Sequence, residues 1–398
     1  MISFDKAFEL TLEHIRPLNR ENADLLAAEG RIAAEDLLAR VDSPSLDVSF
    51  KDGYAIQAND VSAASSQSPV YLTLVGSAAA GGGWYGEVRS GEAVRILSGA
   101  PIPTGADAVV SDEFTQVKSG SVQVTNTAEP GRNILPRGLD VNAGSLIVPA
   151  GKKMSPPAIG LLAAAGLMEV PVIKQPRVAI IATGDEVLAP GQPLLQGKLY
   201  ASNLFTLAAW CQRYGFEVET FLVKDDADRI RLALTTCLQQ FDTMLTSGGA
   251  WKGERDLVVH ILDGLGWQKF YHRVRIGPGK AIAFGLYQDK PVFCLPGGPP
   301  SNHMAFVQLA LPGLHKLAGY SHPGLPKIPA SMAESVTGQV DWTQFKHGCL
   351  LKDDHKLLFQ PLKYQSRLQE MADLEAIACI PEGQVELPAG STVWVQLI

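Results

Sequence analysis

Residues 177–317 alternate short apolar runs with longer amphipathic segments, and this alternation constrains the fold more than any other feature of the sequence. The apolar runs at 177–182, 218–223 and 291–295 have the length and the bounding residues of buried strands, and a fourth, shorter run begins at Met244. Asn203 precedes a segment with the apolar spacing of a helix, and we expect it to cap that helix. Strands that alternate with helices predict a doubly wound α/β domain built on a parallel sheet.

Glycine, hydroxyl and acidic residues follow four of the predicted strands. These segments are Thr-Gly-Asp-Glu at 183–186, Lys-Asp-Asp at 224–226, a glycine-rich loop at 247–256 and Pro-Gly-Gly at 296–298. The carboxyl ends of parallel strands meet at one edge of a sheet, so the pattern predicts one shared ligand cleft there. Backbone N–H groups of glycine loops can bind a phosphate or another oxyanion, and Asp256 can hold a metal ion or a hydroxyl group. Each loop taken alone is explained equally well as a structural turn.

The flanking regions differ in texture from this central segment. Ser3 is expected to cap a first helix, and residues 23–38 have the spacing of a second one. Short β-type runs separated by Gly, Pro, Ser and Asn clusters begin at Asp47 and predict a small all-β unit. The Pro/Gly stretch at 322–326 is the clearest linker, and the short strands after it predict a further β-rich domain.

Composition excludes several classes of protein. A net charge of −7 with interspersed signs argues against a nucleic-acid-binding surface. No apolar run is long enough to span a membrane, and residues 1–5 do not resemble a signal peptide, so we expect a cytoplasmic protein. The five cysteines are far apart and mostly in apolar surroundings, which indicates buried reduced thiols and neither a disulfide framework nor a zinc site.

Six motifs follow one another in the order found in the MoeA family of molybdopterin molybdenumtransferases, which is related to the carboxy-terminal domain of gephyrin. Together they span essentially the whole chain, and the ordered set is far more specific than any one motif. They are Asp-Gly-Tyr-Ala at 52–55, Ser-Gly-Ala-Pro-Ile-Pro-Thr-Gly-Ala-Asp-Ala-Val-Val at 98–110, Arg-Gly-Leu-Asp at 137–140, Ala-Thr-Gly-Asp-Glu at 182–186, Thr-Ser-Gly-Gly at 246–249 and Leu-Pro-Gly at 295–297.

The resemblance implies an elongated homodimer of four-domain subunits. The implied domains are a discontinuous helical linker domain (1–50 and 138–173), an inserted β domain (51–137), a molybdopterin-binding α/β domain (174–322) and a carboxy-terminal β-barrel-like domain (323–398). The implied reaction is insertion of molybdate into adenylylated molybdopterin with release of AMP, assisted by Mg²⁺. A molybdopterin adenylyltransferase and molybdoenzyme maturation proteins are the implied partners, and no nucleic acid or membrane is involved.

The resemblance and the strand-end positions together assign candidate roles. The catalytic candidates are Asp52, Asp140, Glu186, Asp256 and Lys280, the lysine neutralising charge on the leaving AMP. The candidates for cofactor binding are Ser98, Thr183, Gly184, Asp225, Ser247, Gly248, Gly249, Lys252, Pro296, Gly297 and Gly298. Mg²⁺ requires oxygen ligands, which Glu186, Asp225 and Asp256 can supply. Asp52, Ser98 and Asp140 are expected to reach the site from the other subunit.

Several positions depart from the family pattern. Trp251 stands where a serine is usual, Gly277 where a lysine is usual, and Gly298 where an asparagine is usual. Lys346-His347 is the best match to a position where an arginine is usual. Each lost cation is expected to weaken binding of a polyanion by on the order of 1 kcal/mol or more.

Two lysines, Lys51 and Lys252, stand where the family is usually uncharged. We hypothesise that Lys252 replaces the phosphate or molybdate contact of the lysine missing at 277, and the alternative is a solvated loop lysine. Two other functions also stay open: a paralogue that binds molybdopterin or a related nucleotide without transferase activity, and a nucleotide-pyrophosphate hydrolase. His303 follows the last strand end, and we expect it to be a helix-surface histidine outside the chemistry.

Overall fold

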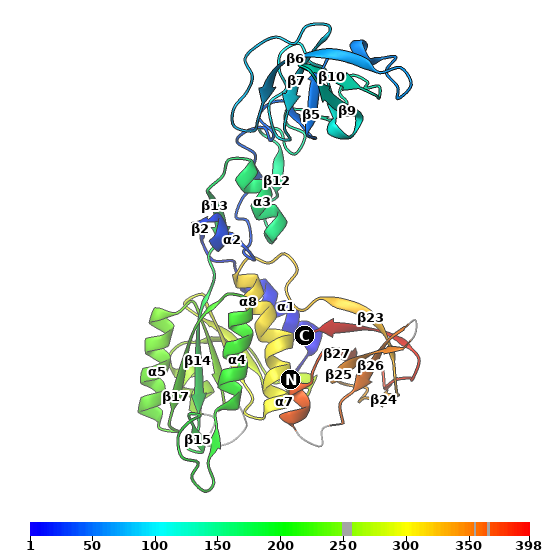
Figure 1. Cartoon of the computed structure of the whole chain (residues 1–398). Helices are drawn as coiled ribbons and strands as arrows, with labels where there is room; N and C mark the ends of the chain where they lie inside the picture. The colour runs from blue at the N-terminus through cyan, green and yellow to red at the C-terminus, as the bar shows by residue number, and fades with distance from the viewer. Residues whose placement is uncertain (249–256, 354–355, 364–366) are drawn as a thin grey trace.

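The computed structural model describes residues 1–248, 257–353, 356–363 and 367–398. The molecule is elongated (Figure 1): a β domain lies at one end, a narrow middle region follows, and a larger body at the other end holds a central α/β sheet beside a carboxy-terminal β-barrel. No helix within the described ranges is both long and apolar enough to cross a membrane.

The central sheet has six strands, of which the first four are parallel and the last two antiparallel. Their order across the sheet is β17 (Glu217–Val223), β14 (Arg177–Thr183), β18 (Thr243–Ser247), β22 (Lys290–Leu295), β21 (Ala283–Tyr287) and β19 (Gln268–His272). The four predicted strand ends therefore do meet at one edge of the sheet.

Helices cover both faces of this sheet, as the doubly wound prediction requires. Along β14, Val178 and Ile180 face a core shared with α4 (Ser202–Arg213), whereas Ala179 and Ile181 face a core shared with α5 (Ala227–Gln240). The helix α6 (Leu257–Gly264) joins the second core. A continuous helical segment made of α7 (Pro299–Ala305), a π-helical turn (Phe306–Ala310) and α8 (Leu311–Leu317) joins the first.

The expected cap at Asn203 is wrong. The helix α4 begins at Ser202, one residue before Asn203. Its N-cap position is Ala201, and no side chain caps it. The amide of Asn203 instead reaches across to the loops that follow β18 and β22, as described below. A contact between distant segments therefore takes precedence over the local capping preference.

The amino-terminal segment contributes to the large body. Its short strand β1 (Ile2–Ser3) pairs with β20 (Val274–Gly277), and the Ser3 hydroxyl accepts the N–H of Lys6 at 3.3 Å to cap α1 (Phe4–His14) as predicted. Helix α1 packs against α8, and Ala7 of the helix and Ile15 just after it join the first core of the α/β domain.

The second helix expected at 23–38 is wrong, because only α2 (Leu25–Ala28) is helical there. The residues before it form β2 (Arg20–Asp24), which pairs with β13 (Glu169–Ile173). The residues after it turn at Gly30, whose φ of +75° ends the helix, and continue to β3. The middle region is completed by the pairing of β3 (Leu37–Leu38) with β12 (Leu146–Val148) and by α3 (Pro156–Ala164).

The β domain at the far end is a six-stranded sheet with apolar clusters on both faces. Its order is β8 (Ala108–Ser111), β5 (Gly53–Ile56), β7 (Glu92–Ile96), β6 (Val70–Ala78), β10 (Ser121–Val124) and β9 (Thr115–Lys118). Two 3₁₀ helices, at Ala58–Val61 and Asp112–Phe114, connect these strands. The first and last segments of the domain pair through β4 (Val48–Ser49) and β11 (Ile134–Leu135).

The carboxy-terminal domain is a five-stranded barrel, because its last strand in the order pairs back onto the first. The order is β25 (Thr343–Asp353), β26 (Lys356–Pro361), β23 (Lys327–Met332), β29 (Thr392–Leu397) and β27 (Ala376–Ile380). The remaining elements are the ladders β15 (Val187–Leu188) with β16 (Leu199–Tyr200) and β24 (Val336–Thr337) with β28 (Glu386–Leu387), and the short helix α9 (Gln369–Ala372). The predicted fold class, a central α/β domain with β domains on either side in the chain, is confirmed.

All five cysteines are free thiols. Cys211, Cys237 and Cys294 are buried as expected, whereas Cys349 and Cys379 are partly exposed.

Candidate active site at the strand ends

Three of the predicted loops meet at the carboxyl edge of the central sheet. Gly248 has a φ of +98°, and a Cβ added there would lie 2.8 Å from the carbonyl oxygen of Thr183. Its N–H donates to the carbonyl of Leu295 at 3.2 Å. A Cβ added at Gly297 would lie 3.9 Å from the Cα of Gly248. Glycine at 248 is therefore required by both its backbone conformation and the close approach of the neighbouring strand end.

Two asparagine side chains converge on the hydroxyl of Ser247, the last residue of β18. The Nδ2 of Asn203 lies 3.2 Å from Ser247 Oγ and also donates to the carbonyl of Gly297 at 2.8 Å. The Nδ2 of Asn302 lies 3.1 Å from the same Oγ and donates to the carbonyl of Pro296 at 2.8 Å. These four hydrogen bonds connect α4, β18, α7 and the loop after β22.

The two backbone carbonyls determine which way each amide group points. A carbonyl oxygen only accepts, so the NH₂ groups of Asn203 and Asn302 must face it, and the same nitrogens then face Ser247. Ser247 Oγ therefore accepts twice, which leaves its own hydrogen free to donate. Among the described residues nothing accepts that hydrogen, although Ser247 is only 5% exposed. The arrangement leaves Ser247 as an oriented donor at the edge of the cleft.

A second hydroxyl at the same edge lacks a partner. Thr183 ends β14 and is 5% exposed, and its Oγ1 makes no hydrogen bond within the described parts of the chain. Buried hydroxyl groups nearly always have a partner. The unsatisfied oxygen beside Gly248 is what a site for a polar ligand would show.

Two predicted acidic residues lie on neighbouring strand ends, after β14 and β17. Gly184 has a φ of +146°, and a Cβ added there would lie 2.8 Å from a carboxylate oxygen of Glu186, so this carboxylate folds back over the loop. Asp185 accepts the backbone N–H of Asp225 at 3.4 Å, which connects the two loops. Across the described ranges no group of three or more His, Cys, Asp or Glu side chains is placed to hold a metal ion. Asp256, Gly249, Trp251 and Lys252 lie outside these ranges.

Lys280 lies between the α/β domain and the barrel. The preceding Gly279 has a φ of +118°, and a Cβ added there would lie 3.3 Å from the backbone nitrogen of Ala305 in α7. The Lys280 Nζ lies 5.3 Å from the ring centroid of Trp342, a cation–π distance. Gly298 precedes α7, and the described atoms leave open space where its Cβ would lie.

The structure places three other candidates far from this edge within one chain. The carboxylate of Asp52 accepts the N–H of Ser98 at 2.6 Å, and the Ser98 hydroxyl donates to the carbonyl of Phe50 at 3.3 Å. The backbone N–H of Asp140 donates to the carbonyl of Ser43 at 2.9 Å. Asp52 and Ser98 adjoin β5 and β7 of the β domain, and Val141, next to Asp140, belongs to the core of the middle region. In Figure 1 both parts lie away from β15, which follows the end of β14 at the opposite end of the molecule.

The expectation for His303 is wrong, because the side chain is buried and not on a helix surface. It is 3% exposed, and its Nδ1 lies 3.1 Å from Nε2 of His347 in the barrel strand β25. Burial lowers the pKa of His303 to about 4 and that of His347 to about 3, so both imidazoles are neutral at pH 7. Burial also lowers the pKa of the neighbouring Lys346.

Sequence reasoning missed the roles of Asn203 and Asn302. Asparagine inside a helix is locally unfavourable because its amide competes for backbone hydrogen bonds, so its presence in α4 and α7 was a usable signal. The partners themselves are 44 and 55 residues away in the sequence, beyond the reach of local patterns.

Comparison with known proteins agrees with the resemblance. Residues 2–166 match the MoeA N-terminal region (domain I and II), and residues 179–316 match a probable molybdopterin binding domain. The chain is 33% identical to the molybdopterin molybdenumtransferase of Haemophilus influenzae over 86% of this chain and 85% of that protein. It is 31% identical to molybdopterin molybdenumtransferase 2 of Mycobacterium tuberculosis over 99% of both chains.

The crystal structure of a molybdopterin biosynthesis MoeA protein from Pyrococcus horikosii superposes on the whole chain. Its TM-score is 0.82, and it is 31% identical with 100% of this chain and 99% of that chain covered. The similarity in sequence and the similarity in fold both cover the whole chain. They therefore include the two β domains as well as the α/β domain that carries the strand-end loops. The chain therefore belongs to the MoeA family of molybdopterin molybdenumtransferases.

Proposed function

We propose that this chain inserts molybdate into adenylylated molybdopterin and releases AMP, in biosynthesis of the molybdenum cofactor. The observation that carries the proposal is the oriented Ser247 hydroxyl beside the unsatisfied Thr183 hydroxyl, where three strand-end loops meet in a MoeA-family chain. Both substrates present oxyanions, and preorganised donors in a water-poor site are the groups that stabilise charge on such oxygens.

The residues of the strand-end loops have distinct parts in the proposed reaction. Gly248 and Gly297 let the substrate approach the backbone closely, because neither position carries a side chain. Ser247 and Thr183 donate hydrogen bonds to phosphate or molybdate oxygens. Lys280, held at the domain boundary by Trp342, supplies positive charge for the leaving AMP.

The donor types at the strand ends suit Mg²⁺. Glu186 and Asp225 follow the neighbouring strands β14 and β17, and carboxylate oxygens are the ligands that this ion prefers. We propose that these two carboxylates hold Mg²⁺, with Asp256 as the third candidate ligand. Bound there, the ion would neutralise charge on a pyrophosphate.

A homodimer completes the proposed site. Asp52, Ser98 and Asp140 lie at a distance from the strand ends of their own chain, so these side chains can act on the substrate only from a second copy. The molybdopterin adenylyltransferase that makes the adenylylated substrate is the proposed partner enzyme, in the cytoplasm.

The decisive experiment measures AMP release from adenylylated molybdopterin by the purified protein with Mg²⁺, with and without molybdate. The cofactor formed is assayed by its ability to activate a cofactor-free molybdoenzyme. Molybdate-dependent release with active cofactor supports the proposal. Release without molybdate identifies a pyrophosphate hydrolase, and binding without release identifies a paralogue that does not catalyse.

A further inference from the structure

A separate cavity of 350 Å³ opens on the β domain, at the outer edge of β8. Its size lies within the roughly 300–1,000 Å³ of small-molecule sites. Val109 and Val110 of β8 are among its lining residues, and none of the residues assigned to the proposed transferase reaction lines it. The cavity is therefore a feature that the transferase proposal does not use.

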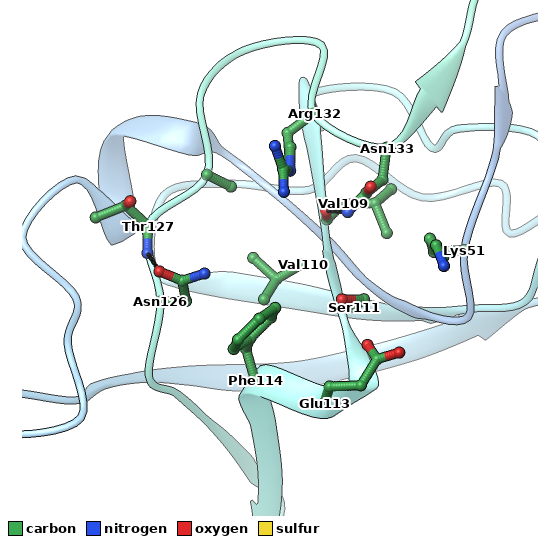
Figure 2. Close-up of a pocket in the computed structure, with 11 residues that line it drawn as sticks. Lys51, Val109, Val110, Ser111, Glu113, Phe114, Asn126, Thr127, Arg132 and Asn133 are labelled. Carbon is green, nitrogen blue, oxygen red and sulfur yellow. Dashed lines mark hydrogen bonds between the residues drawn. The ribbon is translucent and has the colours of Figure 1, made fainter.

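The charges around the cavity favour an anion. Arg132 and Lys51 line it against one carboxylate, that of Glu113 (Figure 2). In the described parts of the chain the Arg132 guanidinium makes no hydrogen bond and no ion pair with a protein group. A hydrogen bond from Ser111, together with the charge of Lys51, holds the pKa of Glu113 below its usual value. The carboxylate therefore stays ionised and available as an acceptor, while Arg132 stays available for an anion.

The wall that carries Arg132 is fixed in place before any ligand binds. The carbonyl of Arg132 accepts the N–H of Val109 at 2.9 Å, and Asn133 donates from Nδ2 to the carbonyl of Val109 at 2.8 Å. The carbonyl of Asn133 also accepts the N–H of Phe50 at 2.9 Å. This wall therefore extends β8 through hydrogen bonds, which lowers the entropy cost of binding.

The opposite wall offers a flat aromatic surface and an amide. The ring of Phe114 borders the cavity below Val110, and Phe114 is 41% exposed, so part of its ring is open to stacking (Figure 2). Asn126 accepts the N–H of Thr127 at 3.0 Å through Oδ1, which leaves its Nδ2 as a donor at the cavity. A flat ring with polar edges is the group that such a wall accommodates.

We propose that this cavity binds a small phosphate monoester that carries a flat ring, of which a nucleoside monophosphate is the common form. Arg132 and Lys51 bind the phosphate, Phe114 stacks on the ring, and Glu113 and Asn126 bind its polar groups or the hydroxyls of the sugar. This site is additional to the strand-end site and does not depend on the transferase proposal.

The test uses the full chain with AMP, ribose 5-phosphate and inorganic phosphate in isothermal titration calorimetry. Arg132→Gln should weaken all three by about tenfold, the loss expected for a charge-assisted hydrogen bond. Phe114→Leu should weaken AMP by about fivefold or more and leave the two ring-free ligands unchanged. Arg89→Gln and Tyr71→Leu are the matched controls, because both residues are exposed on the same domain away from the cavity.

The position of binding is checked by photolabelling with 8-azido-AMP and peptide mapping. Label on residues 109–133 supports the proposal, and it should persist in Ser247→Ala, in which the strand-end site is altered. Label found only on the strand-end loops would overturn the proposal. So would the absence of AMP binding at millimolar concentration, or an equal loss in Arg132→Gln and Arg89→Gln.

Discussion

Replacing Asn302 by aspartate tests whether Ser247 is an oriented donor. Aspartate keeps the shape of the side chain but puts an acceptor oxygen where Nδ2 now lies, 3.1 Å from Ser247 Oγ. The Ser247 hydroxyl would then turn to donate to the new carboxylate and would no longer be available to a ligand oxygen. A hydrogen bond to a charged group contributes about 1.5–3 kcal/mol, so oxyanion affinity should fall roughly 10- to 100-fold.

The variant Asn302→Ala separates this effect from a loss of stability. Asn302→Ala removes both hydrogen bonds of a residue that is 1% exposed, whereas Asn302→Asp reverses the one to Ser247 and places an oxygen against the carbonyl of Pro296. Each substitution should lower the free energy of unfolding by about 2–4 kcal/mol. In Asn302→Ala, however, the Ser247 hydroxyl has no new acceptor and still receives a hydrogen bond from Asn203. Its affinity for a ligand oxyanion should therefore fall by less than about fivefold.

The assay is calorimetric binding of molybdate and of AMP, with Arg132→Gln in every sample so that the β-domain cavity contributes little. Urea unfolding is measured on the same samples. The double variant Ser247→Ala, Asn302→Asp should lose less affinity than the sum of the two single losses, because both changes remove the same donor and only repulsion by the new carboxylate is added. If Asn302→Asp and Asn302→Ala bound equally well, or if the two losses in the double variant added up, the reasoning about the hydroxyl would be refuted.

Three further outcomes follow from the structure. Gly248→Ala should weaken ligand binding and lower the free energy of unfolding by about 1–3 kcal/mol, because the new Cβ would lie 2.8 Å from the Thr183 carbonyl at a φ of +98°. An unchanged free energy of unfolding in urea would contradict this. Heterodimers of Asp52→Ala and Ser247→Ala subunits, isolated with two tags, should release AMP at about half the wild-type rate, although both parent homodimers should be inactive. In such a heterodimer one of the two composite sites keeps both Asp52 and Ser247. Inactive heterodimers would exclude a shared site. The buried imidazoles of His303 and His347 have pKa values of about 4 and about 3, against 6.5 for an exposed histidine. As the pH falls, the unfolded chain therefore takes up protons before the folded chain does, and the free energy of unfolding should decrease between pH 6.5 and pH 4. The decrease should be smaller when both histidines are replaced by Gln.

Patterns of local sequence were enough to predict the central domain. The four apolar runs between 177 and 295 became parallel strands, and the Gly-containing loops after three of them do meet at one edge. This works because a parallel sheet places every carboxyl end on the same side, whatever the details of packing. The six ordered motifs supplied the family, which strand patterning cannot do.

Contacts between distant segments were beyond those patterns. Residues 23–38 have helical spacing, yet only Leu25–Ala28 is helical. The residues before it pair with a strand near residue 170, and the residues after it turn at Gly30 and pair with a strand near residue 147. The sequence around His303 predicts a helix-surface position, because its own helix does not reveal that the barrel covers it and presents His347. In each case a partner more than 40 residues away determines the outcome, so tertiary contacts override the local preference.

The elongated shape of the chain explains why the proposed site requires a dimer. In one chain the strand-end loops face away from the β domain that carries Asp52 and Ser98 (Figure 1). Two copies placed side by side in opposite directions would bring the β domain of each to the far end of the other, and a two-fold axis makes that contact twice. Each proposed site would then combine the donors of Ser247 and Thr183 with the carboxylate of Asp52 from the second copy. An isolated subunit would keep the fold and the strand-end loops but lose the reaction, which is why the heterodimer experiment tests the chemistry as well as the assembly.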